Sequence, residues 1–293
     1  MRRITSLLTC AALVGVGMVS ATTPAIAKTA RPTSVKTSPY VALGDSYSSG
    51  AGVYPQVVGA PPTCSRSQLN YSEDIAKAAH PAAFTDVTCS GAKTSDFFTS
   101  QATGVPPQLD AIGKDTRLIT MTISGNDGNV FVSSFFGCAT VDAGKPTGSP
   151  CKDKYGTTFT DTIREQTYPA LVKALSAVRA KAPNASVFIL GYPQILPERG
   201  SLSCYAITGI SEGDVPWLVH QQRVGNDAVR HAAAVTGVRY VDTYTPSDGH
   251  DECSGVANRW MEPLAMPINA FPVHPNATGE AALARETLAA INR

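Results

Sequence analysis

Five short apolar runs alternate with longer stretches of helical character, and this alternation constrains the fold more than any other feature. The runs are strand-sized and several are almost wholly apolar, as in strands covered on both faces; they span residues 40–43, 85–88, 118–124, 186–191 and 239–242. Helices are expected at residues 67–79, 161–181, 215–236 and 277–291. Irregular loops are expected at 140–156 and 200–213. Strand–helix alternation predicts a parallel sheet with helices on both faces.

The first 27 residues have the pattern of a secretory signal peptide. Two arginines precede an apolar stretch, residues 7–19, that is short for a membrane span, and a small-residue cleavage site ends at Ala27. Residues 28–38, rich in Thr, Lys, Pro and Ser, are expected to be a flexible segment, and residues 39–293 a single domain. The pattern predicts a secreted protein.

The composition argues against two classes of partner. Cleavage after Ala27 would remove two basic and no acidic residues, which leaves 22 basic against 23 acidic residues. The sequence has no basic run, so nucleic acid is not an expected partner. It has no second apolar stretch long enough to span a membrane, so only transient contact with a lipid interface is expected.

Six cysteines follow the signal segment. An even number in an exported chain predicts three disulfides. The sequence contains no CxxC motif of the kind found in zinc sites. Six cysteines allow 15 pairings, which the sequence alone does not resolve. The simplest pairing is sequential: Cys64 with Cys89, Cys138 with Cys151, and Cys204 with Cys253. His250, Asp251 and Glu252 are consecutive and lack the spacing of metal ligands, so a charged surface loop is the favoured interpretation and no metal is expected.

A serine, a glycine and an asparagine follow three of the predicted strands, and a histidine precedes the last helix. They are Ser46 in "GDS", Gly91 in "CSGA", Asn126 in "GND" and His274 in "HPN". Ligands of open α/β sheets bind outside the carboxyl ends of the strands, so these residues can share one edge. Acyl transfer needs such a set, because a serine hydroxyl requires a base and the tetrahedral intermediate requires hydrogen-bond donors.

These four blocks, in this order, resemble those of the GDSL/SGNH hydrolases, and most of all secreted actinobacterial lipases, esterases and phospholipases. The resemblance runs from Tyr40 to the C-terminus. It implies a flavodoxin-like three-layer α/β/α fold around a parallel sheet of about five strands. It also implies Ser46 as nucleophile, His274 as base, and an oxyanion hole formed by the Ser46 N–H, Gly91 and Asn126. The reaction needs no cofactor.

One position departs from the pattern of this family. The usual acid lies three residues before the histidine, where this chain has Phe271. The favoured interpretation is that a backbone carbonyl, of Phe271 or Pro272, orients the imidazole instead. The alternative is a remote carboxylate, from Asp242, Asp248, Asp251, Glu252 or Glu262.

The resemblance predicts a monomeric lipase or esterase, acting on a small-molecule or lipid ester. Phospholipase A1-type cleavage, removal of acetyl groups from a polysaccharide, and a binding protein without turnover are the alternatives. Four aromatic residues are candidates for an acyl site, although aromatics at such spacings also form ordinary core; they are Phe131, Phe135, Phe136 and Phe271.

Overall fold

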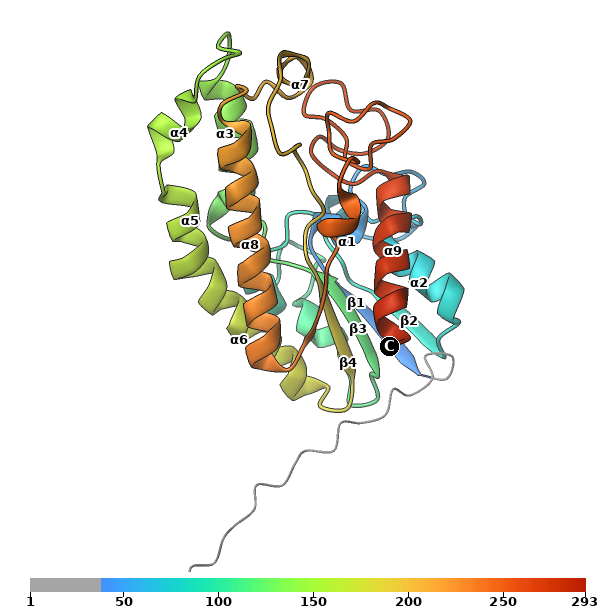
Figure 1. Cartoon of the computed structure of the whole chain (residues 1–293). Coiled ribbons are helices and arrows are strands. Elements are labelled where there is room, and N and C mark those ends of the chain that lie inside the picture. Colours follow the sequence, from blue (N-terminus) through green and yellow to red (C-terminus); the bar gives the residue numbers. More distant parts are fainter. Residues whose placement is uncertain (1–37) are drawn as a thin grey trace, which may run out of the picture. The chain divides into compact units, whose positions relative to one another are not determined.

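Five parallel strands pair in the order β2-β1-β3-β4-β5 at the centre of the computed structural model (Figure 1). They are β1 (Pro39–Gly44), β2 (Ala83–Asp86), β3 (Leu118–Thr122), β4 (Ser186–Leu190) and β5 (Arg239–Val241). All five correspond to predicted strands, although β2 lies two residues earlier than expected. The structure describes residues 38–293, so the expected signal peptide and residues 28–37 lie outside it.

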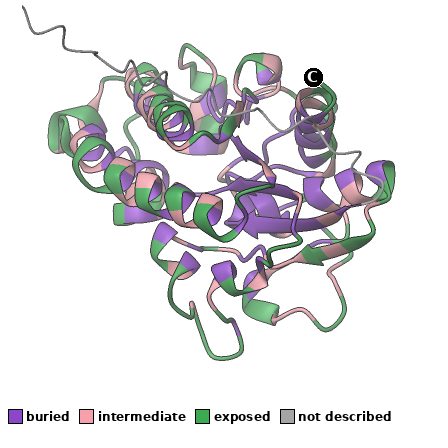
Figure 2. Ribbon diagram, turned by 90° about the horizontal axis from the view of Figure 1, so that it is seen from below, coloured by how far each residue is buried: buried purple, intermediate pink, exposed green. Residues whose placement is uncertain are grey.

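The sheet separates two hydrophobic cores, and successive residues of β1 face opposite sides. Val41 packs with apolar residues of α6 and α8, whereas Tyr40 packs with residues of α2 and α9. Figure 2 shows the buried strands between these helices, whose outer faces are exposed. The helices are α2 (Tyr71–Ala79), α6 (Tyr168–Lys181), α8 (Val215–Thr236) and α9 (Ala277–Ile291). The predicted three-layer α/β/α class with a five-stranded parallel sheet is confirmed.

The expected helix boundaries hold for α8 and α9 and change for the other two. Helix α2 begins at Tyr71 rather than at residue 67, because the Asn70 side chain caps it by accepting the Glu73 N–H at 2.8 Å. The stretch predicted as one helix over 161–181 is three joined segments: α5 (Thr158–Thr162), a π-helical turn (Ile163–Thr167) and α6.

The prediction of irregular loops at 140–156 and 200–213 was wrong. These regions contain α4 (Pro150–Tyr155) and α7 (Leu202–Thr208), which are too short for a periodic pattern. Helix α3 (Val130–Val141) was also missed, because β-branched and aromatic residues fill it without a polar face. The remaining short elements are α1 (Ser46–Ser49) and the 3₁₀ turns Pro62–Cys64, Thr94–Phe97, Gln108–Ala111, Asp127–Asn129 and Thr245–Ser247.

Three disulfides brace the loops at the carboxyl edge of the sheet. Cys64 is joined to Cys89, Cys138 to Cys151, and Cys204 to Cys253, which is the sequential pairing. The second bridge ties α3 to α4, and the third ties α7 to the segment after β5.

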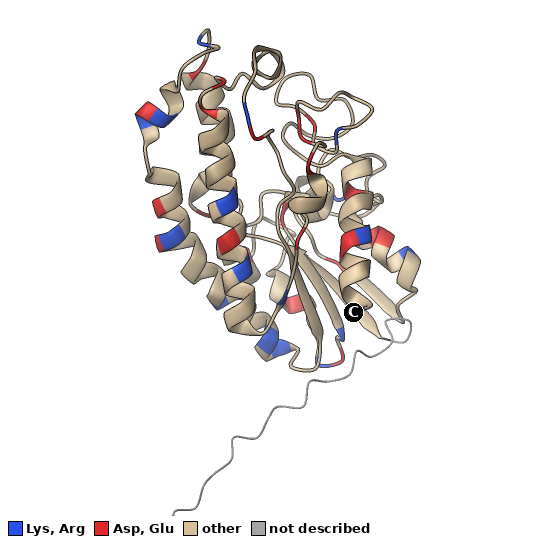
Figure 3. Ribbon diagram, viewed as in Figure 1, with Lys and Arg blue, Asp and Glu red and all other residues tan. Residues whose placement is uncertain are grey.

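Charged residues of both signs are scattered over the helices and loops in the view of Figure 3, and α8 carries both on its outer face. Basic residues form no single patch in this view. Within residues 38–293, no helix combines the length and hydropathy of a bilayer span.

We expect Asn70→Ala to destabilise the folded protein by about 1–2 kcal/mol, because it removes the cap of α2. The substitution also removes the contact of Asn70 Nδ2 with the Asp86 carboxylate. Urea unfolding measures the change, and Asn292→Ala, at an exposed residue after α9, is the control. Equal stability of the two variants would contradict the prediction.

Candidate active site

The turn after β1 presents Ser46 at the carboxyl edge of the sheet. Ser46 begins α1, which is capped by the Asp45 side chain at its start and by Gly50 in the left-handed conformation at its end. Ser46 is 6% exposed, so most of its surface is screened from water. Because β1 lies between β2 and β3, this turn opens at the switch point of the sheet, where ligands of such folds bind.

The Asp45 carboxylate connects the turn that carries Ser46 to the neighbouring strands. Oδ1 accepts the Tyr47 N–H at 3.1 Å and the Thr122 hydroxyl at 2.7 Å. Oδ2 accepts the Tyr192 hydroxyl, whose oxygen accepts the Gly125 N–H at 2.8 Å. Burial raises the pKa of Asp45 to about 6, and the hydrogen bonds from Tyr192, Thr122 and Tyr47 oppose this rise.

The predicted oxyanion donors lie on adjoining loops. Asn126 Nδ2 donates to the Ala92 carbonyl at 3.0 Å, which joins the loop after β3 to the loop that carries Gly91. Gly91 has a φ of +77°, which favours glycine. Neither the Ser46 N–H nor the Gly91 N–H hydrogen-bonds to another group within residues 38–293. Two backbone donors and one amide are therefore available at this edge.

His274 lies on the loop before α9, with its ring held by a carbonyl. Nδ1 is 2.7 Å from the Pro272 oxygen. A carbonyl oxygen only accepts, so Nδ1 carries the proton and Nε2 is left as the basic nitrogen. The Phe271 carbonyl has another role: it accepts the backbone N–H of His274 at 3.2 Å. Of the two carbonyls expected to orient the ring, the one in contact with it is that of Pro272.

Val273, which lies between Pro272 and His274, has a backbone conformation that is rare for a β-branched side chain. Its φ is +62°, which costs about 1–3 kcal/mol and must be supported by its surroundings. The Tyr47 hydroxyl donates to its carbonyl at 2.6 Å, and its N–H donates to the Glu262 carbonyl at 2.8 Å. Tyr47 directly follows Ser46, so one residue of this turn also contacts the loop that carries His274.

Aromatic rings surround His274 and shield its side chain from water. The ring centroids of Tyr47, Phe131 and Phe271 lie 5.2, 5.6 and 6.3 Å from that of the imidazole. Burial lowers the pKa of His274 to about 4, and the hydrogen bond to Pro272 opposes this shift. The side chain is therefore a neutral base at pH 7.

The five carboxylates considered as a remote acid have other surroundings. Asp242 and Asp248 are exposed, and Asp242 accepts the N–H groups of Tyr244 and Thr245. The other three are buried and accept hydrogen bonds elsewhere. Asp251 accepts the Cys253 N–H, Glu252 the Leu264 N–H, and Glu262 the Ile268 N–H and the Arg259 guanidinium. None of the five carboxylates hydrogen-bonds to the His274 ring within the described part of the chain.

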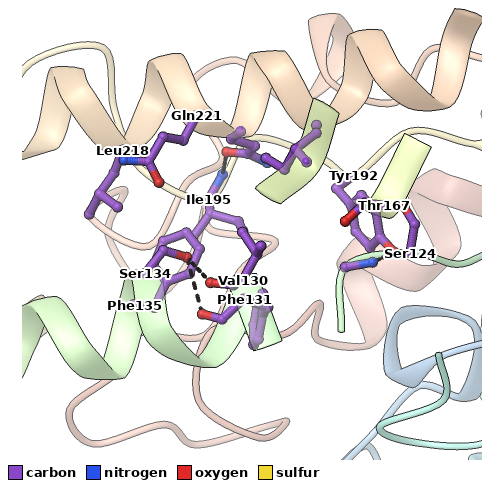
Figure 4. Close-up of a pocket in the computed structure, with 14 residues that line it drawn as sticks. Ser124, Val130, Phe131, Ser134, Phe135, Thr167, Tyr192, Ile195, Leu218 and Gln221 are labelled. Carbon is purple, nitrogen blue, oxygen red and sulfur yellow. Dashed lines mark hydrogen bonds between the residues drawn. The ribbon is translucent and has the colours of Figure 1, made fainter. Parts of the chain in front are cut away.

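A largely apolar cavity opens beside this set of residues (Figure 4). It encloses about 650 Å³ of free space, counted with the solvent at its mouth. The lining comes from α3, the π-helical turn, α8 and the segments after β3 and β4, and includes two of the four aromatic candidates, Phe131 and Phe135. Phe136 and Phe271 do not line it and are 38% and 43% exposed. Ser46 and His274 lie outside the cavity, but Phe131 contacts both its interior and the His274 ring.

Sequence reasoning missed two tyrosines that organise the site. Tyr47 lies within the "GDSYSSG" block, and nothing in the pattern distinguishes its hydroxyl. Tyr192 follows β4, and the rule that ligands gather at strand ends would have found it.

The His250 segment has a structural role. The His250 ring stacks on Trp260 with centroids 4.0 Å apart, and Nδ1 faces the Asn258 carbonyl. In residues 38–293, no three His, Cys, Asp or Glu side chains are grouped to hold a metal ion.

Comparison with known proteins identifies the family. Residues 42–282 match the family model of the GDSL-like lipase/acylhydrolases. The chain belongs to this family. It is a serine ester hydrolase.

Streptomyces proteins are among the relatives. Lipase 2 of Streptomyces coelicolor is 47% identical over 290 residues, which cover 98% of this chain and 96% of that protein. The crystal structure of phospholipase A1 from Streptomyces albidoflavus has a TM-score of 0.73 at 30% identity and covers 86% of this chain and 98% of that one. That of an extracellular lipase from Streptomyces rimosus has a TM-score of 0.69 at 27% identity, over 86% of this chain and 99% of that one.

We expect the His274 ring to stay neutral well below pH 6.5 and to protonate at about pH 4, because burial disfavours the imidazolium. NMR titration of the histidine ring resonances measures this, with His274→Gln to assign the signal. The change should appear as pH falls through 4. A midpoint at or above 6.5 would mean that a carboxylate or solvent stabilises the charged form.

Proposed function

We propose that Ser46 and His274 carry out the hydrolysis of carboxylic esters. The observation that supports this most is the Tyr47 bridge, since Tyr47 follows Ser46, packs against the His274 ring and hydrogen-bonds to Val273. Ser46 Oγ attacks the acyl carbonyl while Nε2 of His274 takes the hydroxyl proton. The bond from the acyl carbon to the alcohol oxygen breaks, and His274 gives that oxygen the proton. A water molecule then attacks the acyl-enzyme in the same way, which releases the acid and restores Ser46.

The negative oxygen of each tetrahedral intermediate is stabilised by the N–H groups of Ser46 and Gly91 and by the Asn126 amide. Asn126 uses one of its two N–H bonds on the Ala92 carbonyl and has the second for substrate. These donors are fixed before substrate binds, and such preorganised donors contribute about 3–4 kcal/mol each in related chemistry.

The Pro272 carbonyl takes the place of the acid. It fixes the tautomer and the ring direction, as a carboxylate would, but stabilises the imidazolium less. With a pKa of about 4, His274 has a low affinity for the proton that it must accept. The oxyanion donors therefore carry a larger share of the transition-state stabilisation in this mechanism.

The substrate class that fits best is a lipid-like ester with an acyl chain longer than acetyl. The apolar cavity beside Gly125 can take such a chain while its carbonyl faces Asn126. Similarity to Lipase 2 of Streptomyces coelicolor supports this class. A phospholipid is the second candidate, because the phospholipase A1 of Streptomyces albidoflavus is 30% identical. Polysaccharide deacetylation would leave most of the cavity unfilled.

Secretion is part of the proposal. The signal-like pattern of residues 1–27, the three disulfides and similarity to an extracellular lipase support export to an oxidising compartment. We propose a monomer that meets its substrate in solution or at a lipid surface.

We expect Ser46→Ala to lower kcat/KM on p-nitrophenyl esters by about 10³-fold or more, since the nucleophile is lost. The wild-type protein should be labelled at Ser46 by a fluorophosphonate. Ser49→Ala, one turn later in α1, is the matched control and should retain activity and labelling. A phosphatidylcholine assay on the same proteins separates phospholipase from lipase. Turnover that survives Ser46→Ala would exclude this mechanism, and absence of both turnover and labelling would favour a binding protein.

We expect Glu252→Gln and Asp251→Asn to change kcat by less than about tenfold, because a carbonyl orients His274. Loss of an acid that orients a catalytic histidine costs about 10⁴-fold. Burial raises the pKa of Glu252, so the neutral amide is a close substitute. Steady-state kinetics at a temperature where each variant is folded decides the matter. A thousandfold loss in either variant would identify that residue as a remote acid.

A further inference from the structure

The polar side chains of the cavity fall into two groups. Three have protein partners: Gln222 bonds to the Ile195 N–H and the Pro193 carbonyl, the Tyr192 hydroxyl bonds to Asp45, and the Ser134 hydroxyl donates to the Val130 carbonyl. These groups shape the cavity and are satisfied without a ligand. Gln221 is different, although it lies on α8 directly before Gln222.

Gln221 is buried in this apolar surrounding with both ends of its amide unpaired. It is 3% exposed, and neither Nε2 nor Oε1 has a hydrogen-bond partner within residues 38–293. Figure 4 shows its side chain projecting from α8, next to Leu218, towards Ser134 and Phe135 on α3. Thr167 is a second lining residue with an unpaired hydroxyl, and Figure 4 places it beside Ser124 and Tyr192, away from Gln221.

An unpaired amide in an apolar cavity is unfavourable for folding, and Met or Leu would fill the same volume without the penalty. A polar group retained at such a place is explained when a ligand completes its hydrogen bonds. The amide offers one acceptor and a pair of N–H donors. A hydroxyl group satisfies both kinds, because it accepts from Nε2 and donates to Oε1.

Other substituents fit less well. A ketone oxygen would leave Oε1 unpaired. A carboxylate would bring an uncompensated charge, since none of the described residues that line the cavity is Lys or Arg. The chemistry of the lining therefore selects a neutral hydroxyl on an otherwise apolar chain.

We propose that Gln221 is a specificity residue that selects esters whose acyl chain carries a hydroxyl group. The proposal rests on the function given above, with the acyl chain in this cavity. Tyr192, whose hydroxyl donates to Asp45 next to Ser46, lies apart from Gln221 in Figure 4, so the proposal places the hydroxyl on the distal part of the chain. The substrate class is the hydroxy fatty-acyl ester.

The test compares two series of ethyl esters in a pH-stat. Their straight acyl chains run from six to twelve carbons, with and without a terminal hydroxyl. For the wild type, the ratio of kcat/KM for the hydroxylated ester to that for the plain ester should peak at one length and exceed about tenfold there. Gln221→Met should flatten this ratio, because the hydroxylated ester loses its hydrogen-bond partner and the plain ester does not. Gln221→Asn, with a shorter side chain, should keep the preference and move the peak to a longer chain.

Thermal unfolding gives an independent readout. Gln221→Met should unfold at the same or a higher temperature than the wild type, because the unpaired amide is gone. A flat ratio in the wild type, or a peak unchanged by Gln221→Met, would overturn the proposal. So would a lower unfolding temperature with an unchanged ratio, which indicates that Gln221 only supports the fold. Absence of turnover on every ester in both series, with Ser46 unlabelled by a fluorophosphonate, would instead reject the proposed function.

Discussion

The site depends on the buried carboxylate of Asp45. Burial disfavours its charge, as the rise of its pKa to about 6 indicates, so it is stabilised only while its donors stay in place. Those donors come from α1, from Thr122 at the end of β3, and from Tyr192 after β4. The carboxylate therefore fixes three strand ends relative to one another. Tyr192 extends this control to Gly125, which precedes the proposed oxyanion donor Asn126.

The histidine is fixed by a second, separate set of contacts. The loop bends at Val273, and its strain persists because both sides of the bend are anchored. Asn276 caps α9 through Thr278 and Gly279 and donates to the Arg259 carbonyl. Tyr47 holds the other side. The strained loop is thus anchored with the Pro272 carbonyl facing the imidazole, which suits a proposed base that lacks a carboxylate partner.

The sequence alone predicted what depends on local pattern. Apolar runs located all five strands, and the residues after them pointed to Ser46, Gly91 and Asn126, because strand ends in this topology share an edge. Helix α3 was not predicted, because its packing between other elements overrides the weak helix propensity of "VFVSSFF". The choice of Pro272 over Phe271 depends on the φ of Val273, and the cavity depends on residues from five segments. Neither is encoded in any one stretch of sequence.

On the proposed mechanism, the two halves of the ester meet surfaces that differ in their exposure to water. The acyl side is the apolar cavity lined by α3, the π-helical turn, α8 and the segments after β3 and β4, where Gln221 is 3% exposed. Phe271, whose ring contacts that of His274, lines a second hollow with Gly52 and with Tyr54, which is 76% exposed. Water-exposed contacts discriminate poorly, whereas a buried polar group left unpaired by the wrong ligand discriminates strongly. On the proposed mechanism, an acyl chain at Gln221 is therefore discriminated more strongly than a group that contacts Tyr54.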